Sequence, residues 1–389
     1  MKIGMLTWES FGKEDMAAAF TKLGHSVIQC PFSDDSEADD PAAIQKLEGN
    51  IRKISPDFLF SFNYFPVAAS ACKNLGLPYV AWVYDSPHVR MYHYTIVYPT
   101  NCIFVFDSAV YMEFHKEGIT TVHYLPMAAN TDRLKGLNDF EAFEKTNWKL
   151  KHQVAFVGSL YTEKHQFYQR MTNISDYTRG YLEGLMEAQK LVYGYNFIQE
   201  RLNGRILDDM RRALPMQVRP GGVESIEYLF AQYVINRQIT ASERMELLSL
   251  VAEKFGLDLY TPDQTLKLTG CANHGALDAY TLAPYVYKMA AVNLNITLRS
   301  IFKGMPLRAF EIMGAGGFLL TNFQEDFLSF FTPDEDFVYY ESKADLINKI
   351  SYYLKNEKER CQIAENGFQK VASQHTYIHR AEEIISFLS

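Results

Sequence analysis

The chain has 389 residues, 48% of them hydrophobic and 22% charged, so it is long enough for two or three folded domains and is not a disordered chain. Its 38 Lys and Arg against 46 Asp and Glu give a net charge of −8, and we expect no nucleic-acid partner. No apolar run reaches the roughly 18 residues of a transmembrane helix, and the first residues show no signal-peptide pattern. We therefore expect a cytoplasmic protein.

Short apolar runs alternate with amphipathic stretches over the first 130 residues. The runs have the length and composition of strands buried on both faces. The predicted strands are Lys2–Thr7, Ser26–Cys30, Asp57–Phe62, Tyr79–Tyr84, Asn101–Phe106 and Thr121–Leu125. The predicted helices between them are Lys13–Leu23, Pro41–Ile54, Phe65–Leu75 and Ala109–Lys116. This alternation predicts an α/β fold with a parallel, doubly wound sheet.

The same pattern restarts after a polar stretch that ends near residue 151. The strands predicted there are Gln153–Gly158, Asp258–Thr261, Ala291–Ile296, Gly317–Asn322 and Phe337–Tyr340. Three helices are predicted at the end, over Lys343–Lys355, Lys358–Ser373 and Tyr377–Leu388. Two such halves place a ligand cleft at the carboxyl ends of their strands.

A helical insertion over about residues 163–255 interrupts the second half. Its tyrosines are expected to pack a helical subdomain, with an acceptor groove as the alternative. They are Tyr168, Tyr177, Tyr181, Tyr193 and Tyr195.

The segment Asn295–Asn322 carries the sharpest chemical signal. A helix starting near Pro306 places Arg308 and Glu311 on one face of its first turns. A helix amino terminus attracts phosphate, and arginine adds a bidentate donor. The carboxylate can accept both hydroxyls of a ribose, and Gly316 with Gly317 lets the chain turn into the next strand. A salt-bridged helix that ends at a glycine is the alternative.

This segment resembles the carboxyl-terminal half of bacterial group 1 glycosyltransferases, in particular their spore-maturation (CgeB-type) branch. The matching residues run from Arg308 to Thr321, and the F-V-G-S-x-Y segment of that branch stands at Phe156–Tyr161. The branch's W-x-x-D-x-P pattern stands at Trp82–Pro87. The likeness covers nearly the whole chain outside the insertion.

The resemblance implies a GT-B fold with two Rossmann-like domains. An acceptor domain is expected over residues 1–147 and a nucleotide-sugar domain over 148–376, with the helix at 377–389 packing back on the first domain. The implied activity is hexosyl transfer from a nucleotide diphosphate sugar, with a UDP-sugar as the expected donor, to a protein, cell-surface polymer or glycan. No cofactor and no metal are expected.

The resemblance also suggests donor-binding residues. Glu311 matches the glutamate that holds the nucleotide ribose. Lys303 stands where the family has a second glutamate, which leaves retention or inversion open, and this lysine is expected to face the pyrophosphate. Gly158 and Ser159 match the turn beside the diphosphate.

Further donor candidates lie outside these motifs. They are Lys164, His274 and Arg299, while Gly316 and Gly317 are donor candidates within the matching stretch itself.

The acceptor side has its own candidates. Asp85 ends a predicted strand and is expected to act as a base or acceptor ligand, with a helix N-cap as the alternative. His88 and Glu9 are further catalytic candidates. Trp82 and Tyr84 are expected to stack on an acceptor sugar.

Three alternatives concern metal and function. Asp334-Glu335-Asp336 has the D-x-D form of a metal motif but is expected to be a solvated turn. A nucleotide-sugar 2-epimerase on the same fold is a second possible enzyme. A two-lobed protein that binds a small ligand without catalysis is the third reading.

Overall fold

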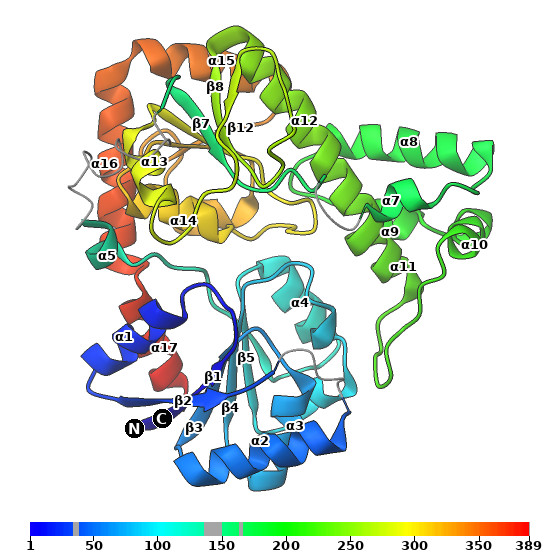
Figure 1. The fold of residues 1–389 in the computed structure, drawn as a ribbon, viewed down its shortest axis with the longest axis vertical. Coiled ribbons are helices and arrows are strands. Elements are labelled where there is room, and N and C mark those ends of the chain that lie inside the picture. Colours follow the sequence, from blue (N-terminus) through cyan, green and yellow to red (C-terminus); the bar gives the residue numbers. More distant parts are fainter. Residues whose placement is uncertain (34–38, 136–149, 163–165, 389) are drawn as a thin grey trace. The chain divides into compact units, whose positions relative to one another are not determined.

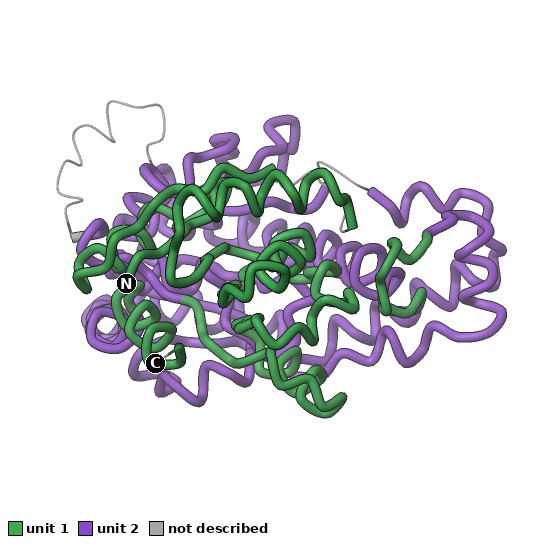
Figure 2. Tube along the Cα trace, turned by 90° about the horizontal axis from the view of Figure 1, so that it is seen from below, with its two compact units in different colours: residues 1–127, 217–226, 376–389 green, residues 128–216, 227–375 purple. Residues whose placement is uncertain are grey.

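The computed structural model describes residues 1–33, 39–135, 150–162 and 166–388. Its contacts divide the chain into two compact units (Figure 2). Unit 1 comprises Met1–Met127, Gln217–Ile226 and Thr376–Ser389, and unit 2 comprises Ala128–Met216 and Glu227–His375. The domain boundary predicted between residues 147 and 148 lies outside the described residues.

Unit 1 is built on a six-stranded parallel sheet with the order β2-β1-β3-β4-β5-β6. Its strands are β1 (Lys2–Thr7), β2 (Ser26–Pro31), β3 (Phe58–Phe62), β4 (Tyr79–Val83), β5 (Asn101–Val105) and β6 (Val122–Tyr124). In the centre of the sheet, Trp82 of β4 lies opposite Phe62 of β3 and Phe104 of β5. Every residue of β3, β4 and β5 is buried, as expected for strands covered on both faces.

Helices cover both faces of this sheet (Figure 1). The helices are α1 (Lys13–Lys22), α2 (Pro41–Ile54), α3 (Pro66–Leu75), α4 (Ser108–Lys116) and α17 (Tyr377–Leu388), with short 3-10 turns η1 (Val89–Met91) and η2 (Tyr94–Val97). Side chains of α2, α3 and α4 share one core with the sheet. On the other face, Phe20 of α1 packs edge-on against Phe58 and Phe60, and Tyr377 of α17 packs against Trp82.

Local signals set the helix ends in unit 1. The Asp40 side chain accepts a hydrogen bond from the backbone N–H of Ala42 at 2.9 Å, which caps α2 just before Pro41. Gly76 ends α3 in the left-handed conformation that glycine adopts most easily. The predicted strands and helices of this half are confirmed to within one or two residues at each end.

Unit 2 contains a second six-stranded parallel sheet, with the order β12-β11-β10-β7-β8-β9. Its strands are β7 (Val154–Val157), β8 (Leu257–Tyr260), β9 (Cys271–Asn273), β10 (Val292–Asn295), β11 (Leu319–Asn322) and β12 (Val338–Tyr340). The predicted α/β fold with two doubly wound sheets is thus confirmed. The sequence prediction missed β9, a strand of three residues.

Helices surround this sheet and form the insertion. They are α5 (Thr131–Lys135), α7 (Phe167–Arg170), α8 (Asp176–Lys190), α9 (Ile198–Arg201), α10 (Gly204–Ala213), α11 (Ile226–Leu229), α12 (Asn236–Phe255), α13 (Ala283–Met289), α14 (Leu307–Gly314), α15 (Lys343–Lys355) and α16 (Glu357–Gln374). A π-helical turn, η3 (Phe230–Ile235), joins α11 to α12, and a 3-10 turn, η4 (Glu325–Ser329), follows β11. Within unit 2, α8, α9 and α10 extend away from the sheet (Figure 1).

One stretch of the insertion packs in unit 1 instead. Residues 217–226 lie between α10 and α11 in the sequence, and Gly222 forms an antiparallel bridge with His93. Tyr94 N donates to Gly221 O at 3.1 Å, and Val223 N donates to Tyr92 O at 2.9 Å. A Cβ atom on Gly221, whose φ is +72°, would lie 2.3 Å from the His93 ring, so this close approach requires glycine.

Of the helices that the structure describes, none combines the length and apolar character needed to cross a membrane.

Candidate functional site

The turn after β7 and the start of α14 meet at the carboxyl edge of the unit 2 sheet. Gly158 follows β7 with φ +153°, and a Cβ atom there would lie 2.4 Å from Arg308 Nη2. Arg308 Nη1 lies 3.4 Å from Asn295 Oδ1 at the end of β10, and its guanidinium is 5.4 Å from the Phe156 ring centre. Residues 150 positions apart in the sequence thus place a guanidinium directly over a glycine turn, where a diphosphate can meet both the charge and backbone N–H groups.

Glu311 lies one turn after Arg308 and is buried. Its Oε2 accepts from Arg133 Nη2 at 3.2 Å. Arg133 also donates to the carbonyl oxygen of Tyr280 at 2.7 Å and stacks on the Tyr280 ring at 3.9 Å. Arg133 was not among the predicted residues, because its partner stands 178 positions away in the sequence.

Two further arginines, both from α12, lie at the same edge. Arg244 is buried and donates to Ile296 O at 3.0 Å and to Ser159 O at 2.5 Å. Its guanidinium lies 5.4 Å from the centre of the Phe156 ring and 5.1 Å from the centre of the Tyr161 ring. The Arg237 guanidinium lies 4.8 Å from the centre of the same Tyr161 ring. Sequence reasoning missed both arginines, since the insertion gave only a helical pattern.

Burial lowers the pKa of Arg244 to about 10, and the positive charge of Arg308 acts in the same direction. At neutral pH the Arg244 guanidinium remains charged. The edge therefore concentrates positive charge in a chain whose net charge is negative, which is the electrostatic condition for holding an anionic group.

Several predicted donor residues have structural roles instead. Arg299 is 8% exposed and forms a bidentate pair with Glu243 at 2.5 and 2.8 Å, while it also donates to Val192 O at 2.8 Å and Lys190 O at 3.2 Å. Burial acts to lower the pKa of Arg299, but the charge of Glu243, its hydrogen bond and smaller contributions from Tyr193 and Tyr340 together outweigh burial and raise the pKa. This is a correction: the guanidinium is used to join α8 to α12.

His274 is also placed for structure. Its Nε2 lies 2.6 Å from Asp258 Oδ1, and its ring stacks on Tyr260 at 4.6 Å. The other oxygen of Asp258 accepts from the backbone N–H groups of Lys151 and His152 at 2.9 and 2.6 Å. His274 therefore links β8 and β9 rather than facing a nucleotide.

Gly316 and Gly317 correct another expectation. Both lie at the amino end of β11, away from the carboxyl edge. Gly316 has φ +79° and ends α14, and a Cβ atom on Gly317 would lie 2.4 Å from the carbonyl oxygen of Tyr287. The pair makes a tight turn and a close helix-to-strand contact, which explains the glycines without a donor.

The remaining donor candidates are at the surface or in the turn itself. Lys303 Nζ pairs with Glu325 Oε2 at 2.8 Å, and both side chains are substantially exposed. Ser159 Oγ accepts from Tyr161 N at 2.9 Å within the turn after β7. Lys164 lies outside the described residues.

In unit 1, Asp85 follows β4 at the carboxyl edge of the sheet. Its Oδ2 accepts a hydrogen bond from Asn63 Nδ2 at 2.7 Å, so it is not the N-cap that was the alternative. Loss of solvent around the carboxyl group raises the pKa of Asp85, while the Asn63 hydrogen bond and the charge of Arg90 act to lower it. Such a carboxylate is a suitable proton acceptor.

His88 lies beside the end of β3. Its Nε2 is 2.9 Å from Tyr64 O and 3.2 Å from Tyr64 N. Burial, together with the charges of Arg90 and Arg219, lowers the pKa of His88 to about 4. The imidazole is therefore neutral at pH 7. Glu9 is exposed in the loop after β1.

The two aromatic candidates for acceptor binding, Trp82 and Tyr84, differ in burial. Trp82 is only 1% exposed and packs between Phe62 and Tyr377, so it cannot stack on a sugar, and that expectation is corrected. Tyr84 is half-buried and lies parallel to the half-buried Trp8 with ring centres 6.4 Å apart. Trp8, directly after β1, is a half-buried tryptophan that the sequence reasoning missed.

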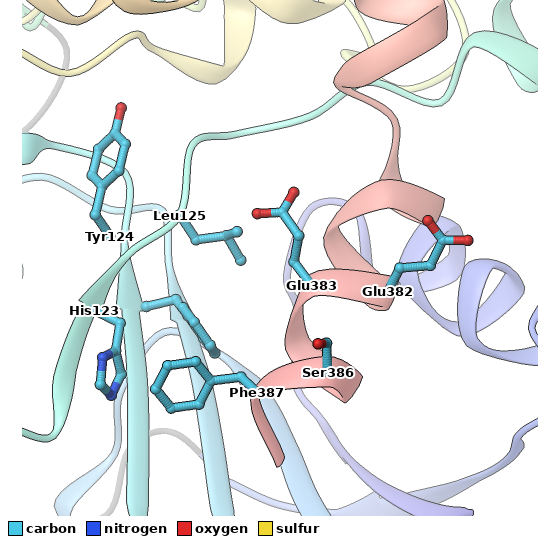
Figure 3. A pocket seen from close by; sticks show the side chains of 8 residues that line it. His123, Tyr124, Leu125, Glu382, Glu383, Ser386 and Phe387 are labelled. Carbon is cyan, nitrogen blue, oxygen red and sulfur yellow. The ribbon is translucent and has the colours of Figure 1, made fainter. Parts of the chain in front are cut away.

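A separate pocket of about 550 Å³ lies in unit 1 between α17 and the edge strand β6 (Figure 3). The rings of Phe104, His123 and Phe387 that line it pack against one another. Glu382 and Glu383 line its α17 side. None of the predicted site residues lines it.

The D-x-D segment forms a turn between η4 and β12, and Asp336 Oδ2 accepts from Thr332 N at 2.9 Å. Among the residues that the structure describes, no three His, Cys, Asp or Glu side chains are grouped as metal ligands.

Comparison with known proteins agrees with this architecture. Residues 247–386 match a family model described as glycosyl transferase-like. A search of curated protein sequences finds no match.

Solved structures match the full length of the chain. A glycosyltransferase from Rickettsia africae is 11% identical with a TM-score of 0.54, over 99% of this chain and 97% of that one. HepE from Anabaena in complex with UDP-glucose is 9% identical with a TM-score of 0.55, over 100% and 99%. The UDP-forming α,α-trehalose-phosphate synthase of Burkholderia vietnamiensis is 11% identical with a TM-score of 0.54, over 100% and 98%.

At these identities the structural likeness establishes the fold, and the family model covers the helices and strands that carry Arg308 and Glu311. The chain therefore has the GT-B fold, and its residues 247–386 are similar to the glycosyl transferase-like family.

Proposed function

We propose that the protein transfers a sugar from a nucleotide diphosphate donor, a UDP-sugar, to an acceptor that is a protein, a cell-surface polymer or a glycan. The observation that carries the proposal is the meeting of Gly158, Arg308 and Glu311 at the carboxyl edge of the unit 2 sheet. The UDP and UDP-glucose complexes of HepE support UDP as the nucleotide.

Each of these residues has a distinct task in the proposal. The Arg308 guanidinium and the backbone at Gly158 receive the diphosphate, whose negative charge grows as the bond to the sugar breaks. Glu311 accepts hydrogen bonds from the ribose hydroxyls, and Arg133 holds its carboxylate in place at 3.2 Å. In unit 1, Asp85 contacts the acceptor hydroxyl and takes its proton.

We also infer membership of the spore-maturation (CgeB-type) branch. The support is the F-V-G-S-x-Y segment at Phe156–Tyr161, which supplies both the aromatic ring under Arg308 and the glycine turn.

Isothermal titration with UDP-, GDP- and dTDP-glucose tests the proposal. We expect binding of the UDP-sugar, and loss of most of that binding in Glu311→Ala. Glu325→Ala is the matched control, because this exposed carboxylate pairs only with Lys303 at 2.8 Å among the contacts described for it. Absence of binding to all three sugars, or equal binding by Glu311→Ala, contradicts the proposal. Product analysis without acceptor separates transfer from 2-epimerisation of the donor.

A further inference from the structure

A buried asparagine holds Asp85 from the end of the neighbouring strand. Asn63 directly follows β3, and it is 1% exposed. Its Nδ2 donates to Asp85 Oδ2 at 2.7 Å, and its Oδ1 accepts from the backbone N–H groups of Tyr84 at 3.1 Å and Asp85 at 3.2 Å. One side chain therefore fixes both the carboxylate and the backbone that carries it.

The backbone of Asn63 is fixed as well. Its φ of +59° is left-handed, a conformation that asparagine tolerates better than most residues but that glycine adopts at no steric cost. Asn63 N donates to Trp82 O at 2.9 Å, and Asn63 O accepts from Ser61 Oγ at 2.6 Å. Glycine alone could adopt this left-handed backbone conformation. What the asparagine side chain adds is its hydrogen bonds to Tyr84 and Asp85.

Asp85 keeps one oxygen for another partner. Part of the Asp85 surface reaches solvent, although its surroundings desolvate the carboxyl group, and the hydrogen bond described for this carboxylate is on Oδ2. A neutral amide donor on Oδ2 fixes the direction of the carboxylate without neutralising its charge. Tyr84, which directly precedes Asp85, is half-buried, and its ring is parallel to that of Trp8 with the centres 6.4 Å apart.

We propose that Asn63 is a positioning residue that orients the Asp85 carboxylate toward the acceptor hydroxyl, a role that rests on the proposed transfer reaction. In that reaction the acceptor oxygen forms a bond to the anomeric carbon of the sugar. The bond from this carbon to the diphosphate oxygen breaks, and its electron pair leaves with UDP. The hydroxyl proton passes to Asp85.

Two variants separate the side chain from the turn. Asn63→Gly keeps the left-handed backbone and removes every side-chain contact. Asn63→Asp keeps an oxygen for the two backbone N–H groups, removes the donor to Asp85 and adds a second carboxylate beside it, whose negative charge also raises the pKa of Asp85. Ser55→Gly is the matched control, because Ser55 is also left-handed, with φ +48°, but ends α2 away from Asp85.

The first readout does not need activity. The carboxyl ¹³C signal of Asp85 is titrated in each protein and assigned with Asp85→Asn. Because a hydrogen bond to the charged carboxylate favours that form, both Asn63 variants are expected to raise the pKa of Asp85, and Ser55→Gly to leave it unchanged. An unchanged titration in both folded variants overturns the proposal.

The second readout is UDP release from UDP-glucose with methyl hexosides as acceptor probes. Both Asn63 variants are expected to lower kcat/KM by about 10- to 100-fold, as a misplaced catalytic group does, and to move the acid limb of the pH profile upward. No UDP release by the unaltered protein contradicts the proposed function itself. Release by both variants at the normal rate contradicts only the role of Asn63.

Discussion

At the scale of single residues, Gly158 is where a side chain is least tolerable. Its φ of +153° is strained for other residues, and a Cβ atom would lie 2.4 Å from Arg308 Nη2. We expect Gly158→Ala to destabilise the protein by about 1–3 kcal/mol and to displace Arg308, which weakens donor binding. Urea unfolding and UDP-glucose titration measure the two effects. Gly180→Ala in α8 is the control, since no atom lies within 4 Å of the new methyl group, and it should stabilise or leave stability unchanged.

Arg308 itself supplies charge to the proposed diphosphate site. Removing one preorganised donor to a developing negative charge costs about 10²- to 10³-fold in rate, so we expect Arg308→Ala to lower UDP-glucose turnover by that factor. Lysine keeps the charge but not the bidentate geometry, and Arg308→Lys should fall between. Arg211→Ala, at an exposed arginine of α10, is the control. Turnover in Arg308→Ala equal to that of the control would remove this residue from the site.

At the scale of elements, the bidentate pair of Arg299 and Glu243 joins the end of α8 to α12. Both side chains are buried, so removal of one leaves the other charge without its partner. We expect Arg299→Met to lower the free energy of unfolding by about 3–5 kcal/mol. The comparison is Lys343→Met, which breaks the exposed pair with Glu246 and should cost less than about 1 kcal/mol. Chemical denaturation measures both, and equal losses would contradict a structural role for Arg299.

The same pair shows what a sequence can and cannot predict at this scale. Strands such as β4 were predictable because every residue in them is buried and apolar runs have a recognisable length. The spacing of Arg308 and Glu311 was visible because it lies within one helix. The burial of Arg299 and its ion pair with Glu243 were not predictable, because Glu243 stands 56 positions away in the sequence and burial depends on tertiary packing. Trp82 was misassigned for the same reason: nothing local distinguishes a buried tryptophan from one that meets a sugar.

At the scale of the whole molecule, the repeated strand and helix pattern predicted two sheets, and the structure contains two parallel six-stranded sheets. The pattern could not predict that residues 217–226, in the middle of a helical insertion, pair with Tyr92–Tyr94 of unit 1. That pairing depends on backbone hydrogen bonds and on the space left by Gly221, which leave no periodic signal. Unit 1 is thus assembled from three separate pieces of the chain.

Unit 1 also contains histidines whose surroundings disfavour the charged form of the imidazole. Burial lowers the pKa of His88 from 6.5 to about 4 and lowers the pKa of His93 and His123. The unfolded chain therefore binds more protons than the folded one between these values. The folded state keeps its full free energy of unfolding with respect to these histidines above pH 6.5, where they are neutral in both states. It loses stability as the pH falls toward 4, because protonation then favours the unfolded chain. Asp85, with its raised pKa, acts in the opposite sense.

We therefore expect unit 1 to become markedly less stable between pH 6.5 and 4, and His88→Gln to flatten this dependence. Trp8 and Trp82 both belong to unit 1, so tryptophan fluorescence during urea unfolding reports on it once Trp148 is replaced by Phe. His115→Gln, at an exposed histidine of α4, should keep the pH dependence of the unaltered protein. The comparison is between the two variants' plots of unfolding free energy against pH. If the His88→Gln plot falls as steeply as the His115→Gln plot, the acid sensitivity of unit 1 comes from other groups and His88 is not its source.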